Sequence, residues 1–133
     1  AWLLETIEGV WSEFSRKFLA LWRSEAKGDG YPVSLFAGEA GAARLEAERQ
    51  AYMARLFQDT VGFAAAKTIR RILGLAHNID FEWIADEKQR AVCEARSLKL
   101  ARRMMLETGA FTTIGTVTYA ARELRHWQPD FAR

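Results

Sequence analysis

Trp2 to Trp22 reads WLLETIEGVWSEFSRKFLALW, and its large apolar side chains recur at spacings of three and four residues. That period lines them along one side of an α-helix and leaves glutamate, arginine and lysine on the other side. Three tryptophans and two phenylalanines on one helix require a large partner surface. No capping side chain precedes this helix and the chain does not begin with methionine, so we expect a piece cut from a longer protein.

Turn signals separate this helix from a second, longer one. Residues 27–32, KGDGYP, predict a break, because the glycines permit turn geometry and the proline disfavours helix in the residue before it. After an irregular stretch, helix is predicted over residues 42–76. The sequence DTVG at residues 59–62 allows either a bend or a boundary between two helices. The predicted buried positions of this segment are Tyr52, Leu56, Ile69, Ile72, Leu73 and Ala76.

Two further helices are predicted downstream. One covers residues 86–107, and Thr112 or Thr113 can cap the last helix, which runs to about His126. The Val-Thr run at residues 116–118 is the only strand-like stretch, and its neighbours favour helix. Because no strands alternate with the helices, the predicted fold class is all-α, in a single helical segment over residues 1–133.

The composition is that of a globular domain. The 133 residues are 50% hydrophobic and 27% charged, enough for one compact domain with one core. The net charge of +2 is spread without blocks of like charge, so no nucleic acid is expected as a partner. No stretch approaches the ~20 apolar residues of a membrane span, and no signal peptide is visible. We therefore expect a cytoplasmic protein with no membrane partner.

The sequence gives little support to metal or thiol chemistry. Cys93, the single cysteine, excludes an internal disulfide and is read as a buried or half-buried filler, because no histidine is placed near it. His77 and His126 lie far apart, and neither has a second ligand one helical turn away, so no metal site is predicted. His77 is read instead as a helix C-terminal residue that interacts with the helix dipole.

Three short motifs imitate nucleotide-binding elements. Gly28-Asp29-Gly30 lacks a preceding strand, and residues 38–41 lack a GK[ST] ending, so both are read as loops. Asp80-Phe81-Glu82 resembles the metal-holding Asp-Phe-Gly of protein kinases, but no catalytic loop precedes it. We read it as a turn in which Asp80 caps the next short helix. The chain therefore has no predicted catalytic, cofactor-binding or metal-binding residue.

Arg70 and Arg71 are the remaining candidates. At 100° per residue, Arg70 lies at the edge of an apolar helix face, beside the small residues Ala66 and Gly74, and Arg71 lies nearly opposite that face. Small neighbours would let a ligand approach Arg70 closely. The alternative, an ordinary solvated face with one arginine extended along it, stays open from the pattern alone.

Two stretches resemble a known enzyme family. YMARLFQDTVGFA at residues 52–64 and KTIRRILGLAH at residues 67–77 are similar to the C-terminal region of S-methyl-5-thioribose kinases. The tryptophan-rich first helix, the Tyr31-Pro32 pair and Asp80-Phe81-Glu82 fit the same family. The resemblance covers nearly the whole chain.

The resemblance implies a protein-kinase-like fold, close to choline kinases and aminoglycoside phosphotransferases, of which this chain would be the helical C-terminal part of the C-lobe. It implies transfer of the ATP γ-phosphate, with Mg²⁺, to the 1-hydroxyl of 5-methylthioribose in methionine salvage, and a homodimer. The family's twin arginine matches Arg70 and Arg71, which places them at the substrate and transferring phosphate.

The N-lobe, the catalytic loop and the metal-holding carboxylates precede this region in the family, and none is present here. The isolated chain is therefore expected to be inactive. Two alternatives stay open: a standalone helical binding module derived from a kinase-like protein, and an unrelated helical bundle. If the chain is a fragment, we expect exposed apolar surface along Trp2, Trp11, Phe18 and Trp22, with self-association or binding of a hydrophobic dye.

Overall fold

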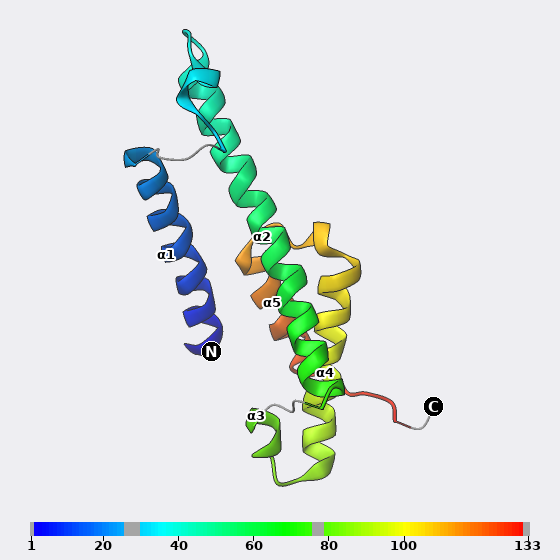
Figure 1. The fold of residues 1–133 in the computed structure, drawn as a ribbon. Helices are drawn as coiled ribbons and strands as arrows, with labels where there is room; N and C mark the ends of the chain where they lie inside the picture. Colours follow the sequence, from blue (N-terminus) through cyan, green and yellow to red (C-terminus); the bar gives the residue numbers. More distant parts are fainter. Residues whose placement is uncertain (1, 26–29, 76–78, 132–133) are drawn as a thin grey trace. The chain divides into compact units, whose positions relative to one another are not determined.

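The computed structural model describes residues 2–25, 30–75 and 79–131, and every regular element within these ranges is helical. The all-α fold class is confirmed. The contacts divide the chain into two compact units, Ala1–Leu56 and Phe57–Arg133. The helices follow one another as α1 (Trp2–Ser24), α2 (Gly41–Leu73), α3 (Ile79–Glu82), α4 (Glu87–Leu106) and α5 (Ile114–Leu124), with 3-10 helices at Val33–Phe36 and Thr108–Ala110 (Figure 1).

The first unit is held together by an aromatic cluster between α1 and the first half of α2. The ring of Phe18 stacks on that of Tyr52 at 6.0 Å between centroids, and the Trp22 ring meets Tyr52 edge-on at 5.2 Å. Tyr31 contacts Trp22 at 5.2 Å, and its hydroxyl accepts a hydrogen bond from Arg55 at 3.1 Å. Offset and edge-on aromatic pairs are favourable beyond the area that they bury. Phe18 and Trp22 of α1 thus find their partner surface within the chain.

An ionic network lies beside this cluster. The guanidinium of Arg23 binds the carboxylate of Glu46 through two hydrogen bonds, and Gln50 Nε2 donates to Glu46 Oε1 at 2.9 Å. Arg49 is only 11% exposed; it pairs with Glu46 at 3.4 Å and lies over the Trp22 ring at 5.9 Å. The hydrogen bonds from Arg23 and Gln50 lower the pKa of Glu46 from its ordinary 4.5 to about 2.

This depressed pKa predicts a pH dependence of stability. Because Glu46 binds its proton less tightly in the folded chain, its contribution is fully present above about pH 4.5 and is lost as the pH falls towards 2. We expect Glu46→Gln to lower the melting temperature at neutral pH, and the difference from the parent chain to vanish as the pH approaches 2. Circular dichroism melts at several pH values measure both, with Glu48→Gln as the matched control. A difference that persists unchanged at pH 2 would contradict the assignment.

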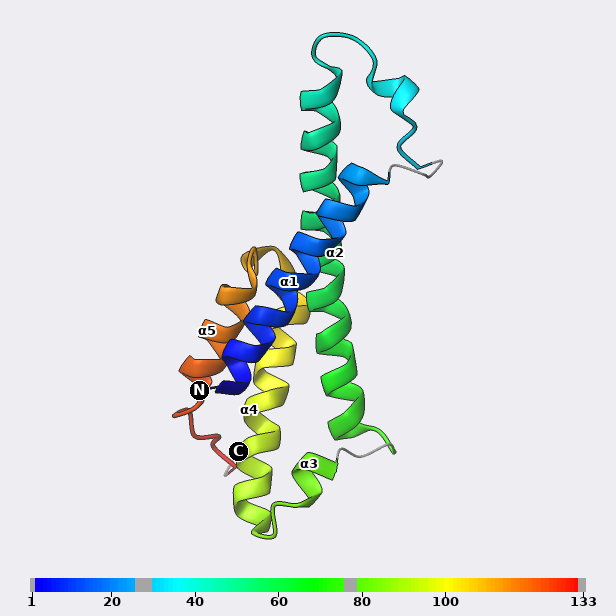
Figure 2. The same ribbon diagram turned by 90° about the vertical axis from the view of Figure 1, so that its left-hand side faces the viewer.

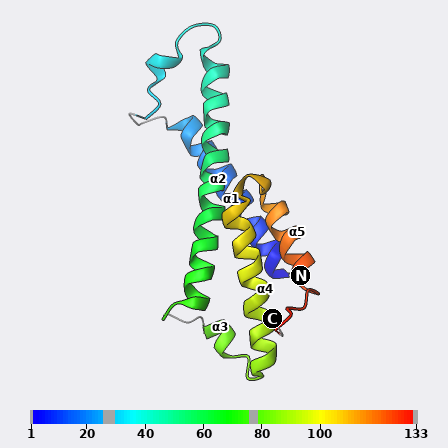
Figure 3. The same ribbon diagram turned by 90° about the vertical axis from the view of Figure 1, so that its right-hand side faces the viewer.

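The second unit packs α4, α5 and the second half of α2 around one small core. Its largest fully buried side chains are those of Phe111 and Thr118, which are 2% and 1% exposed. Gln58 Nε2 donates to the Phe111 carbonyl oxygen at 2.7 Å, which ties α2 to the turn between α4 and α5. Figure 3 shows α4 running beside α5. The other buried apolar residues of this unit are Phe57, Val61, Ala65, Ala101, Met104, Ala120 and Leu124.

Local capping fixes where α4 and α5 begin. The side chain of Asp86 accepts from the backbone amides of Lys88 at 2.9 Å and Gln89 at 3.1 Å, and Thr113 forms a capping box with Thr116. Such caps satisfy backbone donors that the first turn of a helix leaves without partners. The predicted starts of these helices, residue 86 and Thr113, are therefore confirmed. The strand-like run at residues 116–118 is helical, also as predicted.

Two predictions about the middle of the chain are wrong, and one of two open alternatives is excluded. A boundary between two helices at residues 59–62 is excluded, because α2 continues without interruption from Gly41 to Leu73. Leu73 is 71% exposed rather than buried, since it is the last residue of the helix. Asp80 does not cap the next helix; it lies inside the short helix α3. The predicted break at residues 27–32 falls partly, and Ala76 and His77 fall wholly, outside the described residues.

The prediction of exposed apolar surface on α1 is confirmed in part. Trp2 is 71% exposed, but Trp11, Phe18 and Trp22 are half-buried, because Phe18 and Trp22 belong to the aromatic cluster. The exposed apolar surface lies instead on the neighbouring positions of the helix, from Leu3 to Leu21. None of the described helices combines the length and the apolarity that a membrane span requires.

Candidate functional site

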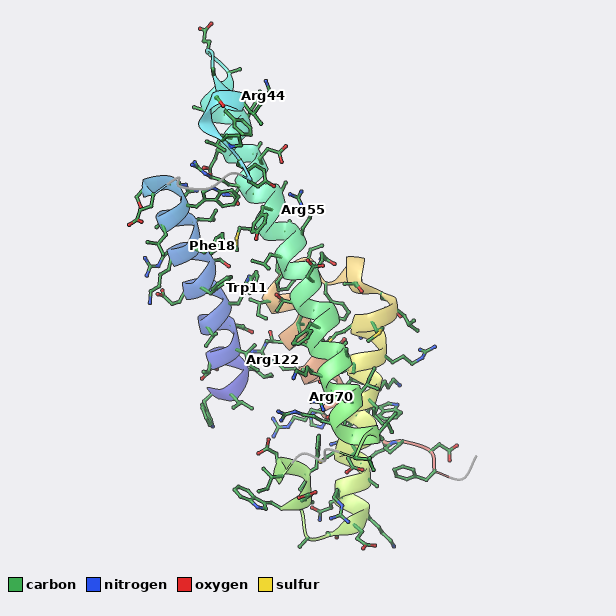
Figure 4. All side chains as sticks on the ribbon, viewed as in Figure 1. Trp11, Phe18, Arg44, Arg55, Arg70 and Arg122 are labelled. Carbon is green, nitrogen blue, oxygen red and sulfur yellow. The ribbon has the colours of Figure 1, made fainter. Side chains whose placement is uncertain are left out.

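The candidate site is the last turn of α2, where Arg70 and Arg71 are both exposed. Figure 4 labels Arg70 near the end of this helix. The backbone amide of Gly74 donates to the Arg70 carbonyl oxygen at 2.9 Å and closes the helix. Ile69 and Ile72 on the same turn are half-buried. The apolar side of the turn therefore anchors the backbone that carries the two guanidinium groups.

Arg70 and Arg71 point in different directions, because neighbouring residues on an α-helix are rotated by about 100°. A small ligand on one side of α2 can therefore contact one of the two guanidinium groups directly. Arg70 passes close to Gly74: a Cβ built on that glycine would lie 3.6 Å from Arg70 Cγ. The predicted small neighbour of Arg70 is thus in place. A larger residue is excluded by the Arg70 carbonyl oxygen, which would lie 2.4 Å from the same Cβ.

The charge of the pair is uncompensated within the described part of the chain, where neither arginine has an acidic partner within ion-pair distance. Lys67 lies one turn earlier, at i−3 and i−4 from the pair, and its ammonium is 5.5 Å from the centroid of the Phe63 ring. Three cations thus gather at a helix C-terminus, where the helix dipole favours positive charge. Lys67 was not among the site residues predicted from the sequence.

The other side chains considered from the sequence do not form a second site. Over the described ranges, no three His, Cys, Asp or Glu side chains come together as a metal ion would require. His126 is exposed, and His77 lies outside the described residues. Cys93 is half-buried on α4, as predicted. The arrangement at the end of α2 can therefore bind and orient an anion, and it offers no general base and no metal ligand set.

Replacing Gly74 is expected to destabilise the end of α2. An alanine Cβ at this position would lie 2.4 Å from the Arg70 carbonyl oxygen, so Gly74→Ala must displace the end of α2 and break the hydrogen bond that closes it. We expect a loss of about 1–3 kcal/mol in the opening free energy of this turn, measured by amide hydrogen exchange. Gly62→Ala is the matched control: no atom lies within 4 Å of its Cβ, so it should stabilise α2 by about 0.5–1 kcal/mol. Equal effects of the two substitutions would contradict the geometry.

Comparison with known proteins gives these residues a context. No family model matches the chain. It is 40% identical over 118 residues to methylthioribose kinase 1 of Oryza sativa subsp. japonica, a match that covers 87% of this chain and 27% of the relative. It is 31% identical over 121 residues to methylthioribose kinase of Escherichia coli O45:K1, covering 91% of this chain and 28% of the relative. Methylthioribose kinase of Geobacillus kaustophilus is 33% identical over 110 residues, a match that covers 83% of this chain and 25% of the relative.

These similarities define a relationship to kinases. The family is that of the methylthioribose kinases: the chain is homologous to a segment of these proteins, as the resemblance predicted. It spans about a quarter of the length of the curated relatives that it matches. A match that covers 87% of the chain necessarily spans its middle, where Arg70 and Arg71 lie.

Proposed function

We propose that this chain forms part of a kinase that transfers the γ-phosphate of ATP to the 1-hydroxyl of 5-methylthioribose, a step of methionine salvage. The observation that carries the proposal is the similarity to methylthioribose kinases over about nine tenths of the chain. The chain would be the helical C-terminal part of a kinase-like C-lobe, in a cytoplasmic enzyme that acts as a homodimer.

Arg70 and Arg71 are the proposed contribution of this chain to the active site. Phosphoryl transfer needs positioning and charge stabilisation more than covalent chemistry by the protein. A guanidinium presents several N–H donors in a planar fork, which matches phosphate oxygens or a pair of sugar hydroxyls. Both guanidinium groups are exposed and free of acidic partners within the described ranges, so neither is committed to a structural ion pair.

ATP and Mg²⁺ do not fit the residues described here. Mg²⁺ is held by one or two carboxylates together with substrate phosphates, whereas the last turns of α2, from Lys67 to Leu73, carry three cations and no carboxylate. We therefore place ATP and Mg²⁺ on the three quarters of the relatives' length that has no counterpart in this chain. We therefore expect no turnover from residues 1–133 when they are assayed alone.

The coding DNA upstream of Ala1 tests the proposal directly. We expect an in-frame stretch that encodes a glycine-rich loop, a His-Gly-Asp loop and an Asp-x-Glu pair. A start codon at the boundary would contradict the proposal. The remaining candidate would then be a standalone, non-catalytic helical module that binds a partner.

A further inference from the structure

Phe63 on α2 exposes an aromatic ring that the core of its unit does not use. Its side chain is 67% exposed, whereas Val61 and Ala65, two residues before and after it, are buried. The Lys67 ammonium, one helical turn later, lies 5.5 Å from the centroid of this ring. A cation within about 6 Å of a ring centroid is attracted by the charge distribution of the ring. The ring therefore restrains an exposed lysine that would otherwise sample many conformations.

Helical geometry places Phe63, Lys67 and Arg70 on one side of α2. At about 100° per residue, Lys67 lies about 40° to one side of Phe63, and Arg70 lies about 20° to the other. Arg71 lies about 80° from Phe63, at the edge of this side. With a rise of about 1.5 Å per residue, the positions from Phe63 to Arg70 span about 10 Å along the helix. All three are exposed, so one ring and two cations share a surface as long as a small ligand.

The two cations on this side of α2 are not neutralised by the described part of the chain. Neither Lys67 nor Arg70 has an acidic partner within ion-pair distance there, and residues 60–79 include no aspartate or glutamate. In contrast, Arg16 and Arg23 of the first unit are each paired with a glutamate. The partial negative charge at the C-terminus of α2, about half an elementary charge, offsets only a fraction of the two cations. The ligand that complements this surface is therefore an anion.

Lys67 and Arg70 are spaced to contact one phosphoryl group. Residues three apart on a helix have Cβ atoms about 5–6 Å apart, so the charged ends of these long side chains can converge on one tetrahedral anion. The ammonium offers a compact point charge with three donors, and the guanidinium offers a planar fork of donors. Phosphoryl transfer spreads negative charge over the phosphoryl oxygens, which such donors stabilise. Ala66 and Gly74, one turn on either side of Arg70, are small enough to leave room for the anion.

We propose that Lys67 is a third residue of the substrate site: together with Arg70 it contacts the transferred phosphoryl group, and Phe63 is the positioning residue that holds its ammonium in place. The inference rests on the kinase function proposed above, and it selects Arg70 rather than Arg71 as the arginine that shares this group. The ammonium forms no covalent bond and gives up no proton. The phosphoryl group passes from ATP to the sugar oxygen, which releases ADP and the hydroxyl proton.

Equilibrium binding to a kinase that contains this chain gives the first test. Lys67→Met keeps the length of the side chain and removes its charge. We expect it to weaken binding of 5-methylthioribose 1-phosphate by about tenfold to a hundredfold, because one charged hydrogen bond is lost. Binding of the unphosphorylated sugar should change by less than about twofold. Lys99→Met is the matched control, since the Lys99 ammonium also lies over a ring, 4.0 Å from the centroid of Trp127. Equal losses for the two ligands, or no loss, overturn the role of Lys67.

A double-mutant cycle tests the positioning role of Phe63. Phe63→Leu should weaken binding of the 1-phosphate by about twofold to fivefold when Lys67 is present, which is the strength of an exposed contact between a cation and a ring. In the Lys67→Met background the same substitution should have no further effect, because the ammonium that the ring holds is absent. Phe63→Trp should bind as tightly as the parent, since tryptophan is the best ring for a cation. Losses that add in the double variant overturn the positioning role.

Inorganic phosphate separates a failure of this inference from a failure of the proposed function. Titrated into the 133-residue chain, it should shift the amide resonances of α2 around Lys67 and Arg70, with weaker affinity in Lys67→Met than in Lys99→Met. A kinase that binds no methylthioribose would overturn the proposed function, and phosphate binding that depends on Lys67 would still support the anion site. Equal phosphate binding by the two variants overturns the anion site, whatever the sugar does. Helicity equal to the parent chain, by circular dichroism, shows that each variant folds.

Discussion

In a kinase that contains this chain, the double substitution Arg70→Ala with Arg71→Ala is expected to lower kcat/KM for methylthioribose by about a hundredfold to a thousandfold, the range typical of removing a charge-stabilising donor from an active site. The two guanidinium groups are exposed and carry no acidic partner within the described residues, so their removal should leave the helix folded. The effect should therefore appear in catalysis and not in the melting temperature.

The single substitutions should divide the effect unequally, because the two side chains leave α2 about 100° apart. We expect the residue that meets the substrate to account for nearly all of the loss, and a lysine in its place to restore only part of it, since lysine keeps the charge without the planar fork. Arg102→Ala, which removes an exposed arginine from α4, is the matched control. Unchanged activity of the double variant would remove both arginines from the site.

The second large expected effect is a loss of stability when Phe111 is replaced by alanine. This side chain is 2% exposed, lies between α4 and α5 in sequence, and has the Arg103 guanidinium 5.8 Å from its ring centroid. Phe111→Ala leaves a cavity that the surrounding helices cannot fill, so we expect the second unit to lose about 3–5 kcal/mol of stability. Hydrogen exchange of the α4 and α5 amides measures the loss in this unit alone.

An exposed aromatic residue of the same unit provides the comparison. Tyr119 on α5 is 61% exposed, and Tyr119→Ala should change the same exchange free energies by less than about 0.5 kcal/mol. If Phe111→Ala were tolerated as easily as Tyr119→Ala, the core of the second unit would have to lie elsewhere.

Local signals in the sequence were sufficient to predict where α4 and α5 begin. Asp86 and Thr113 cap these helices through contacts two or three residues away, so the information lies in a few neighbouring residues. The continuity of α2 could not be predicted in the same way. DTVG at residues 59–62 contains residues that disfavour helix, but Phe57, Val61 and Ala65 on adjacent turns are buried in the second unit, and this tertiary packing outweighs the local preference.

The candidate site was only partly visible in the sequence. The pattern placed Arg70 beside small residues, and the structure confirms the close passage at Gly74. The hypothesis that the pair contacts substrate came from the family resemblance, because an exposed arginine on a helix has no pattern that separates a ligand contact from a solvated surface. The aromatic cluster could not be predicted for another reason: Tyr31 and Tyr52 contact Trp22 but lie well beyond the one-turn spacing that a helical pattern relates.

The chain after α5 contains Trp127, a tryptophan whose fluorescence can report on its own surroundings. Trp127 lies with its indole 4.0 Å below the Lys99 ammonium, and its carbonyl oxygen accepts a hydrogen bond from Arg96 at 2.7 Å (Figure 2 shows the segment that follows α5). Indole emission responds to a nearby cation and to contact with water, so release of this segment from α4 would change the fluorescence of Trp127. In a chain whose other tryptophans are replaced by phenylalanine, the fluorescence of Trp127 would report in real time whether the segment after α5 is packed on α4. No attached dye would be needed.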